Sequence, residues 1–470
     1  MIKDIYSPRG AEGQFSFGGI EFVVFGQLKQ FFAYGVFDDG ANVHVPIITQ
    51  EQRPYISLGR FDPATLKKLI KKFRLASKTR RSKDFSPERR SAFNRLYLDI
   101  SLDCNLRCRY CYVDEQRQGL TQFMSIETAK TAIDWLVLQK NLSESLEIRF
   151  FGGEPLLNLP LIRNLVSYCK ALRNSAGIDF RFYLSTNGTL IDMACARFLA
   201  KENFCIKVSL DGPESIHDKN RVYPEGTGSY LDVLKGIKNL MSCELRPTIC
   251  VTSESLCLSD IQQISQSISE LGDLNIQWQT VRGTAQAGDL SPTHPAPNTD
   301  YEPMAFSCWE ELLCGNNSGL SIFAPGIRKF IDNSTDMRGC GAGLDSIMLS
   351  PDGSFHLCQR FLGIQDFIFG NISSGCDIDG LHSQIEKTLD IYRLQCENCW
   401  LKYLCSKGCY FTNYLNSGDI GTIDRTDCET IRAYYQAVIW LCYKMALHLP
   451  NELFSLLNSS TYLDSGYDRE

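Results

Sequence analysis

Apolar and polar residues alternate along the middle of the chain in a way that predicts repeated strand–helix units. Six short runs rich in β-branched and aromatic residues lie between residues 96 and 281: LYLDISL, LEIRFFGG, DFRFYLSTN, FCIKVSLDG, RPTICVTS and LNIQWQTV. Helical patterns such as SIETAKTAIDWLVLQ and GSYLDVLKGIKNLM separate them. Alternation at this spacing predicts parallel β/α units. Because six units are two short of a closed eight-stranded barrel, we expect an open, partial (β/α)6 TIM-like barrel.

The flanking segments have different patterns. Residues 14–60 contain strand-like runs, and Leu66, Leu69, Ile70 and Phe73 follow at helical spacing, which predicts a small N-terminal α+β domain. Residues 67–95 hold 12 Lys or Arg and 2 acidic residues, which indicates a solvated linker or a surface for an acidic peptide. The expected domains are 1–92 (N-terminal domain and basic linker), 93–300 (barrel core), 301–335 (bridging segment), 336–440 (cysteine-rich domain) and 441–470 (C-terminal helix and tail).

Composition narrows the class of protein. Of the 470 residues, 44% are apolar and 22% are charged, and the net charge of −6 argues against a general affinity for nucleic acid. No apolar run reaches the ~18–20 residues of a membrane span, and the N-terminus lacks the pattern of a signal peptide. We therefore expect a cytoplasmic protein with no membrane partner. In a reducing compartment, clusters among its 20 cysteines indicate metal binding or redox chemistry.

The first group of cysteines follows the first predicted strand directly: Cys104, Cys108 and Cys111. Three thiolates within eight residues can wrap one iron–sulfur cube. A four-iron cluster takes four thiolates, so three leave one iron open to bind and activate a ligand. Zinc is the alternative, but structural zinc sites usually take four ligands in CxxC-type pairs, and no second pair or nearby His completes such a site here.

The second group contains seven cysteines with turn residues between them: Cys340, Cys358, Cys396, Cys399, Cys405, Cys409 and Cys428. The segment SPDG at 350–353 predicts a hairpin turn, and the later cysteines follow the pattern CxxC-x5-C-x3-C. Seven ligands suit two further clusters with interleaved ligands. A zinc ribbon is the alternative, although seven ligands are too many for one zinc ion and awkward for two. Several of the other ten cysteines lie in apolar runs and are interpreted as small core residues.

Glycine and polar residues follow the next three predicted strands. The second strand ends in Gly-Gly-Glu-Pro at 152–155, the third in Ser-Thr-Asn-Gly at 185–188, and the fourth in Ser-Leu-Asp-Gly-Pro at 209–213. In barrels of this kind the chemistry lies at the C-terminal ends of the strands. We therefore expect these groups to share one face with the first cysteine group.

These motifs, CxxxCxxC, GGEP, STNG and SLDGP in this order and spacing, resemble the radical S-adenosylmethionine (SAM) superfamily from roughly Tyr97 to Arg282. The seven-cysteine pattern resembles the SPASM domain, the auxiliary-cluster module of peptide- and protein-modifying members. Together the two resemblances cover about two-thirds of the chain.

The resemblance implies that the open iron chelates the amine and carboxylate of SAM, and that a 5′-deoxyadenosyl radical then abstracts a hydrogen from the substrate. Glu154 would accept a hydrogen bond from the methionine ammonium, and Ser209 and Arg221 would hold the methionine carboxylate. The SAM site implied by the resemblance consists of Gly152, Gly153, Glu154, Ser185, Asn187, Ser209, Asp211 and Arg221.

For the auxiliary clusters, the resemblance assigns Cys396, Cys399, Cys405 and Cys428 to a distal cluster, and Cys340, Cys358 and Cys409 to a proximal one. In some members an eighth cysteine lies six residues before the one that matches Cys340, and Ser334 occupies that position here. The proximal cluster is expected either to keep an open iron, which could bind a substrate thiolate, or to recruit Cys308, Cys314 or Cys376. The implied cofactors are three [4Fe-4S] clusters and SAM.

A finer resemblance concerns the product. Cys340-Gly-Ala-Gly, Cys358-Gln-Arg-Phe and GNI at 370–372 resemble maturases that link a cysteine sulfur to an acceptor carbon, such as the SCIFF-peptide and quinohemoprotein amine dehydrogenase maturases. We therefore expect an oxidoreductase that forms a Cys thioether or related crosslink in a ribosomally made precursor peptide. The alternatives are a formylglycine-forming sulfatase maturase, a peptide epimerase or carbon–carbon crosslinking enzyme, and a non-catalytic zinc-binding scaffold.

The expected partners are a precursor peptide with a leader and an electron donor such as ferredoxin or flavodoxin. The N-terminal domain is interpreted either as a module that binds the leader by strand addition or as a structural cap on the barrel.

Overall fold

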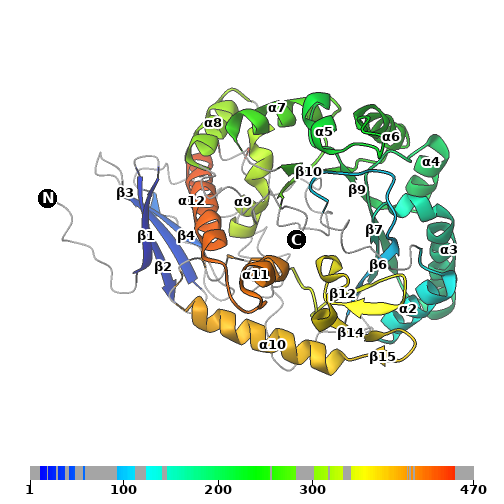
Figure 1. Ribbon diagram of the computed structural model, residues 1–470. Helices are drawn as coiled ribbons and strands as arrows, with labels where there is room; N and C mark the ends of the chain where they lie inside the picture. Colours follow the sequence, from blue (N-terminus) through cyan, green and yellow to red (C-terminus); the bar gives the residue numbers. More distant parts are fainter. Residues whose placement is uncertain are drawn as a thin grey trace.

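The computed structural model describes most of the chain from residue 93 to residue 449 and the backbone of five earlier strands (Figure 1). The described ranges are 93–111, 123–139, 145–253, 257–281, 301–315, 318–331 and 340–449, apart from 398, 400, 402, 403, 406 and 407, together with residue 452 and the strands between residues 11 and 58.

Six parallel strands form the centre of the molecule and pair in chain order. They are β6 (Arg95–Ser101), β7 (Leu146–Gly152), β8 (Phe180–Thr186), β9 (Cys205–Ser209), β10 (Thr248–Ser253) and β11 (Ile276–Thr280). The connecting helices are α2 (Ile126–Leu138), α3 (Leu159–Ala176), α4 (Met193–Lys201), α5 (Glu214–Asn220), α6 (Tyr230–Ser242) and α7 (Leu258–Ser269). These helices lie outside the curved row of strands in Figure 1, which confirms the expected partial (β/α)6 barrel.

The cysteine-rich region continues the same sheet. β12 (Ser346–Leu349) pairs in parallel with β6, and β13 (Ser354–His356), β14 (Ile368–Asn371) and β15 (Gly375–Cys376) extend the sheet with antiparallel pairings. Between β12 and β13 the Gly353 N–H donates to the Ser350 carbonyl at 2.9 Å, which confirms the predicted SPDG hairpin turn. The second cysteine group is therefore joined to the barrel through the edge of β6.

The remaining helices lie beyond the sheet. They are α8 (Tyr301–Leu313), α9 (Ala324–Ile331), α10 (Ile378–Gln395), α11 (Tyr410–Ser417) and α12 (Arg425–His448), with the short 3-10 helices η1 (Pro155–Asn158), η2 (Ser318–Ile322), η3 (Gln359–Phe361) and η4 (Gln365–Phe367). α12 contacts α8 and α9, and it buries Trp440 and Val438 in a second apolar core. Among the described residues, no helix is both long enough and apolar enough to cross a bilayer.

The N-terminal strands form a separate antiparallel sheet. Its strands are β1 (Ala11–Phe17), β2 (Ile20–Gln27), β3 (Gln30–Val36), β4 (Asn42–Ile47) and β5 (Ser57–Leu58), which pair in chain order. In Figure 1 this sheet lies beside α12, which β1 contacts. The helix predicted around residues 66–73 and the basic run that precedes residue 93 lie outside the described residues.

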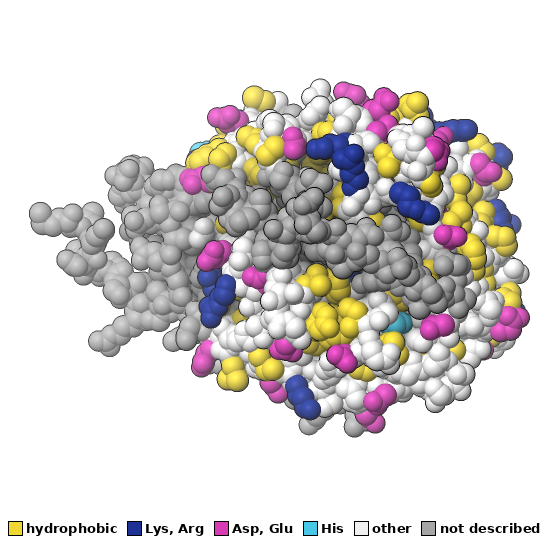
Figure 2. Space-filling model, in the orientation of Figure 1, with side chains coloured by type: hydrophobic (Ala, Val, Ile, Leu, Met, Phe, Trp, Pro, Cys, Tyr) yellow, Lys and Arg dark blue, Asp and Glu magenta, His cyan; other side chains and the backbone are white. Residues whose placement is uncertain are grey.

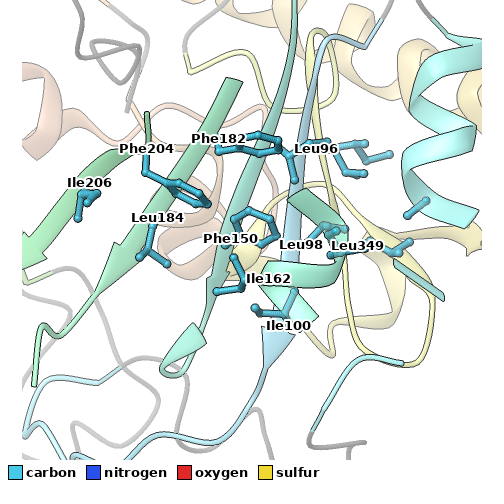
Figure 3. Close-up of a cluster of buried hydrophobic side chains, with 14 of the residues drawn as sticks. Leu96, Leu98, Ile100, Phe150, Ile162, Phe182, Leu184, Phe204, Ile206 and Leu349 are labelled. Atoms are coloured by element: carbon cyan, nitrogen blue, oxygen red, sulfur yellow. The ribbon is translucent and has the colours of Figure 1, made fainter. Parts of the chain in front are cut away.

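The main apolar core lies between the barrel strands and their helices. Alternate residues on each strand point to this side, including Leu98 on β6, Phe150 on β7 and Phe182 on β8 (Figure 3). The Phe150 ring stacks at 6.4 Å from Phe182 and at 5.9 Å from Phe204. Several of the intervening residues, including Tyr97, Arg149 and Tyr183, are buried as well, so much of both faces of these strands avoids water, as expected for a parallel sheet.

A cation–aromatic cluster fills the barrel interior below the ends of the strands. The Arg149 guanidinium lies 4.4 Å from the centre of the Tyr183 ring and 5.3 Å from that of Tyr97, and it pairs with Glu147 at 2.6 Å. Because a buried charge is costly unless it is paired and hydrogen-bonded, this arrangement accounts for an arginine that is only 2% exposed.

We expect Phe150→Ala to lower the free energy of unfolding by about 3–5 kcal/mol, because truncation of a buried Phe removes apolar contacts and leaves a cavity. Phe123→Ala is the matched control, since Phe123 is 45% exposed and its loss should change stability by about 0.5 kcal/mol or less. Urea denaturation followed by circular dichroism measures both. Equal losses in the two variants would contradict this assignment of the core.

Candidate active site

The first cysteine group lies in a loop, here called the cysteine loop (residues 102–111), that follows β6. The Ser101 hydroxyl donates to the Asp103 carbonyl at 3.1 Å and so fixes the start of the loop. Within the loop, the Leu106 N–H donates to Cys104 Sγ at 3.4 Å and the Cys111 N–H donates to the Cys108 carbonyl at 3.1 Å. The three cysteines are all partly accessible.

Gly152 and Gly153 allow the end of β7 to approach the cysteine loop closely. The Gly153 N–H donates to the Ser101 carbonyl at 2.6 Å, and the Glu154 N–H donates to the Asp103 carbonyl at 2.8 Å. A Cβ on Gly153 would collide with the Asp103 carbonyl, and Gly152 has a φ of +136°, which disfavours residues with a side chain. The two glycines are therefore required for the backbone contact that positions the loop.

Glu154 connects the end of β7 to the end of β8. Its fully buried carboxylate accepts hydrogen bonds from the Leu156 N–H at 3.0 Å, the Thr186 hydroxyl at 2.8 Å and the Asn187 N–H at 2.7 Å. Burial raises the pKa of Glu154 to about 7, although these donors oppose the shift. In this structure its hydrogen bonds are to protein groups. A carboxylate oxygen can accept more than one bond, so Oε2 retains capacity for an ammonium.

Asn187 reaches from the end of β8 to the cysteine loop. Its Nδ2 donates to Asn105 Oδ1 at 2.8 Å and lies 3.8 Å from Cys104 Sγ. Its Oδ1 accepts from the Thr189 hydroxyl at 2.7 Å, and Asn105 Nδ2 donates back to that hydroxyl oxygen at 2.9 Å. The predicted SAM-contacting residue Asn187 therefore orients the cysteine loop in this structure.

The two predicted serines lie at the ends of adjacent strands on the barrel's inner face. Ser185 on β8 is in register with Lys207 on β9, and Ser209 on β9 is in register with Cys250 on β10. Both serines are half-buried. The structure thus brings them to the same end of the barrel as the cysteine loop.

Asp211 and Arg221 form a buried ion pair at this end of the barrel. Arg221 Nε donates to Asp211 Oδ2 at 2.8 Å and its Nη2 donates to Oδ1 at 3.2 Å. The Thr252 N–H and the Tyr110 hydroxyl also donate to the Asp211 carboxylate. Arg221 was expected to hold the methionine carboxylate. The structure pairs it with Asp211, so a bound carboxylate would share this guanidinium.

Arg221 also acts on the cysteine loop. Its guanidinium lies 5.3 Å from the centre of the Tyr110 ring. Burial raises the pKa of Cys108, and the charge of the nearby Arg221 opposes that shift. On either side of Arg221, the Asn220 and Val222 carbonyls accept from the N–H groups of Arg109 and Arg107, at 2.9 and 2.7 Å. The segment that carries Arg221 thus holds the loop by its backbone as well.

A neutral histidine, His217, connects the backbones of the two residues of the ion pair. His217 Nδ1 accepts from the Asp211 N–H at 3.2 Å, so its Nε2 carries the proton toward Ser229 Oγ at 3.0 Å. The Ser229 hydroxyl in turn donates to the Arg221 carbonyl at 2.8 Å. Burial and the nearby Arg221 charge lower the pKa of His217 to about 4, which keeps this chain of hydrogen bonds intact at neutral pH.

The donor set around the first cysteine group suits an iron–sulfur cluster. Cys104 receives a backbone N–H and an amide Nδ2, and Cys108 lies beside a guanidinium. Such donors and positive charge stabilise thiolates, the form that binds metal. Cys104, Cys108 and Cys111 would hold the cluster, as predicted from their spacing.

The second cysteine group divides into two sets in space. Burial raises the pKa of Cys358, and the neighbouring Cys409 and Cys340 raise it further. The pKa of Cys428 is raised to about 11 by burial and by Cys405, Cys396 and Cys399, while Arg432 lowers it. The resemblance assigns the first of these sets to a proximal cluster and the second to a distal one. Cys340 and Cys358 flank the β12–β13 hairpin, whereas Cys428 lies in the first turn of α12.

The candidates for an eighth ligand lie in other surroundings. Cys308 is buried in the second apolar core beside Glu311, and Cys376 on β15 has its pKa raised to about 12 by burial and by Asp377. Cys314 is exposed, and Ser334 lies outside the described residues. Over the part of the chain that the structure describes, no three Cys, His, Asp or Glu side chains converge as ligands of one metal ion. A multi-iron cluster, in contrast, holds its thiolates around a larger core.

Sequence reasoning missed several residues that organise this site. Tyr110 and Asn105 lie inside the cysteine motif, so their proximity to the site could have been inferred from their position. His217 and Ser229 belong to no recognisable motif, and only the fold brings them under the ion pair.

We expect acid to weaken the fold through His217. Its pKa is about 4 in the folded protein and about 6.5 when unfolded, so below pH 6.5 protons bind preferentially to the unfolded chain. The resulting loss of stability develops as the pH falls from about 6.5 to about 4 and reaches about 3 kcal/mol. His217→Asn should be less stable than the parent at pH 7.5, and the difference in urea midpoint should narrow by pH 5. The same difference in urea midpoint at pH 7.5 and pH 5 would contradict the lowered pKa of His217.

Comparison with known proteins identifies the barrel. Residues 99–259 match the model of the Radical SAM superfamily. An uncharacterized protein of Methanocaldococcus jannaschii is 37% identical over 163 residues, which cover 34% of this chain and only 54% of that relative. The Cysteine-type anaerobic sulfatase-maturating enzyme of Clostridium novyi is 25% identical over 357 residues, covering 72% of this chain and 92% of the enzyme. The radical SAM cyclopropyl synthase TigE of Paramaledivibacter caminithermalis is 27% identical over 373 residues, covering 73% of both.

Solved structures share the fold. Native anSMEcpe with bound AdoMet has a TM-score of 0.64 at 20% identity and covers 76% of this chain and 99% of its own. Streptococcus suis SuiB bound to S-adenosylmethionine has a TM-score of 0.52 at 15% identity and covers 79% of this chain and 84% of its own. The radical SAM family implies a SAM-binding [4Fe-4S] cluster and AdoMet. Residues 99–259 therefore form a radical SAM domain, and the chain is homologous to the anaerobic sulfatase maturases and to the cyclopropyl synthase TigE.

Proposed function

We propose that this chain is a radical SAM maturase that modifies a ribosomally made precursor peptide, and that its product is a Cys thioether or a related intramolecular crosslink. The observation that carries the proposal is that the seven C-terminal cysteines have separate neighbours, Cys340 and Cys409 beside Cys358, and Cys396, Cys399 and Cys405 beside Cys428. Such sets fit two auxiliary [4Fe-4S] clusters beside the one in the cysteine loop. An oxidative crosslink removes hydrogen from the peptide, and auxiliary clusters supply a place for the remaining electron.

At the SAM site, the bound cluster and SAM supply the radical that abstracts hydrogen. The chain's own residues position them and exclude water. Gly152, Gly153 and Glu154 hold the start of the cysteine loop and present an acceptor for the methionine ammonium. Arg221 stabilises the thiolate of Cys108 and, with Ser209, offers donors to the methionine carboxylate. Asp211 and Asn187 orient these groups from the ends of β9 and β8.

Peptide complexes of similar proteins support the substrate class. One solved structure holds anSMEcpe with AdoMet and the Kp18Cys peptide, and another holds SuiB with the precursor peptide SuiA. The five-stranded N-terminal sheet has β1 at one edge, where a leader could add as a further strand. A low-potential donor such as ferredoxin or flavodoxin would reduce the clusters. None of the 20 cysteines, all of them described, is in a disulfide, which suits a cytoplasmic location.

Formylglycine formation is the second candidate, because the Clostridium novyi relative is a Cysteine-type sulfatase-maturating enzyme with which this chain aligns over 92% of the enzyme's length. Peptide epimerisation and carbon–carbon crosslinking would begin with the same hydrogen abstraction. The mass and the chemical reactivity of the modified peptide distinguish these reactions from one another.

Iron and sulfide analysis tests the cofactor assignment. After anaerobic reconstitution we expect about 12 iron and 12 sulfide per chain, from three clusters of four. The double variant Cys396→Ala/Cys399→Ala should retain about 8 of each, since the distal cluster loses two ligands. Cys169→Ala is the control, because Cys169 is a buried core residue on α3 and its loss should leave the count at about 12. A parent value near 4, or zinc in place of iron, would overturn the proposal.

Product analysis tests the reaction. The reconstituted enzyme is incubated with SAM, dithionite and a short cysteine-containing precursor, to be sought among the products of neighbouring genes, and the peptide is analysed by mass spectrometry. We expect 5′-deoxyadenosine and a peptide lighter by two hydrogens that does not react with a hydrazide or a thiol reagent. Trapping by a hydrazide would instead establish formylglycine. A mass that is unchanged in H2O but rises by about one unit in D2O, through a carbon-bound deuterium, would establish epimerisation.

A further inference from the structure

One charged side chain at the distal cysteine set has no role in the function proposed above. Arg432 lies on α12, four residues after Cys428, and therefore on the same face of the helix. Its Nη2 is 3.8 Å from Cys399 Sγ, within the range of a hydrogen bond to sulfur. Cys399 and Cys428 come from segments 29 residues apart, and Arg432 links the helix that carries one to the loop that carries the other.

Arg432 places a positive charge beside the distal cysteine set. Its guanidinium is a permanent cation, because arginine does not lose its proton in proteins. The guanidinium is half-buried, so solvent screens its charge less than that of an exposed side chain. Cys428 also lies in the first turn of a 24-residue helix, where the helix dipole stabilises a thiolate.

These contacts bear on the redox behaviour of a cluster held by the distal set. Four thiolates give such a cluster a net negative charge, and one-electron reduction adds a further negative charge. A fixed cation and a hydrogen bond to a ligand sulfur stabilise the reduced form more than the oxidised form, and hydrogen bonds to the sulfurs are a recognised control of cluster potential. The cluster then accepts an electron more readily.

We propose that Arg432 is a positioning residue that raises the reduction potential of the distal auxiliary cluster through its charge and its hydrogen bond to Cys399. The proposal rests on the proposed function in one respect only, namely that the distal set binds a [4Fe-4S] cluster. It assigns Arg432 no contact with substrate or SAM. Its consequence is that the distal cluster accepts an electron more readily than it would without Arg432.

The test measures potential rather than activity. The full-length variant Cys104→Ala/Cys108→Ala/Cys111→Ala retains the auxiliary clusters without the SAM cluster, and is reconstituted anaerobically and titrated with dithionite under EPR and visible absorption. Into this background are introduced Arg432→Gln, Arg432→Lys and the matched control Arg425→Gln. Arg425 lies on the same helix, three residues before Cys428, but is exposed, so its charge is screened. Iron per chain is determined for every sample.

We expect Arg432→Gln to lower the potential of one of the two transitions by about 59 mV or more, a tenfold change in the ratio of reduced to oxidised cluster for a one-electron couple. The other transition should not move, Arg425→Gln should move neither, and Arg432→Lys should restore part of the shift because it keeps the charge. Unchanged potentials in Arg432→Gln at full iron content would overturn the role of Arg432 and leave the proposed function intact. A background protein with iron for fewer than two clusters would overturn both, and the iron analysis separates the two cases.

Discussion

The buried ion pair between Asp211 and Arg221 is the contact on which the arrangement of the site depends. Two charges removed from water are stable only when the geometry is good and the remaining hydrogen-bonding groups are satisfied. Asp211 meets this condition through Thr252, Tyr110 and Arg221, and its own N–H is bonded to His217. Since Tyr110 lies between Cys108 and Cys111, the same pair that satisfies Asp211 also fixes the loop that carries the cysteines.

The cysteine loop is therefore held from two sides. On one side the Gly152–Gly153 backbone bonds to the start of the loop, and on the other the carbonyls around Arg221 bond to its middle. Asn187 and Asn105 add a side-chain connection to the end of β8. A metal-binding loop that must present three thiolates to one cluster needs such restraint, because each ligand that moves independently weakens the binding of all of them.

The distal cysteine set resembles the cysteine loop in having an arginine beside one of its cysteines, although other helices and loops provide the residues. At the cysteine loop a guanidinium lies beside Cys108, and at the distal set a guanidinium lies beside Cys399. Arg221 is almost fully buried and paired with a carboxylate, whereas Arg432 is half-buried and interacts mainly with thiols. Much of the positive charge of Arg221 is thus compensated by Asp211, while that of Arg432 acts chiefly on sulfur.

The sequence by itself determined the partial barrel, the grouping of the cysteines and the strand ends that carry the site. Period-two strands, helical spacing and short motifs are local properties, and parallel strands bring their C-terminal ends to one edge whatever the detailed packing. The sequence could not determine that Asp211 pairs with Arg221, that Asn187 bonds to Asn105, or that His217 accepts a hydrogen bond from the Asp211 N–H. Those contacts join residues up to 82 positions apart. They therefore depend on how strands and loops approach one another in space, and on which donors lie within hydrogen-bonding distance of each buried acceptor. The fold decided them because a buried polar group must find a partner within the core that encloses it.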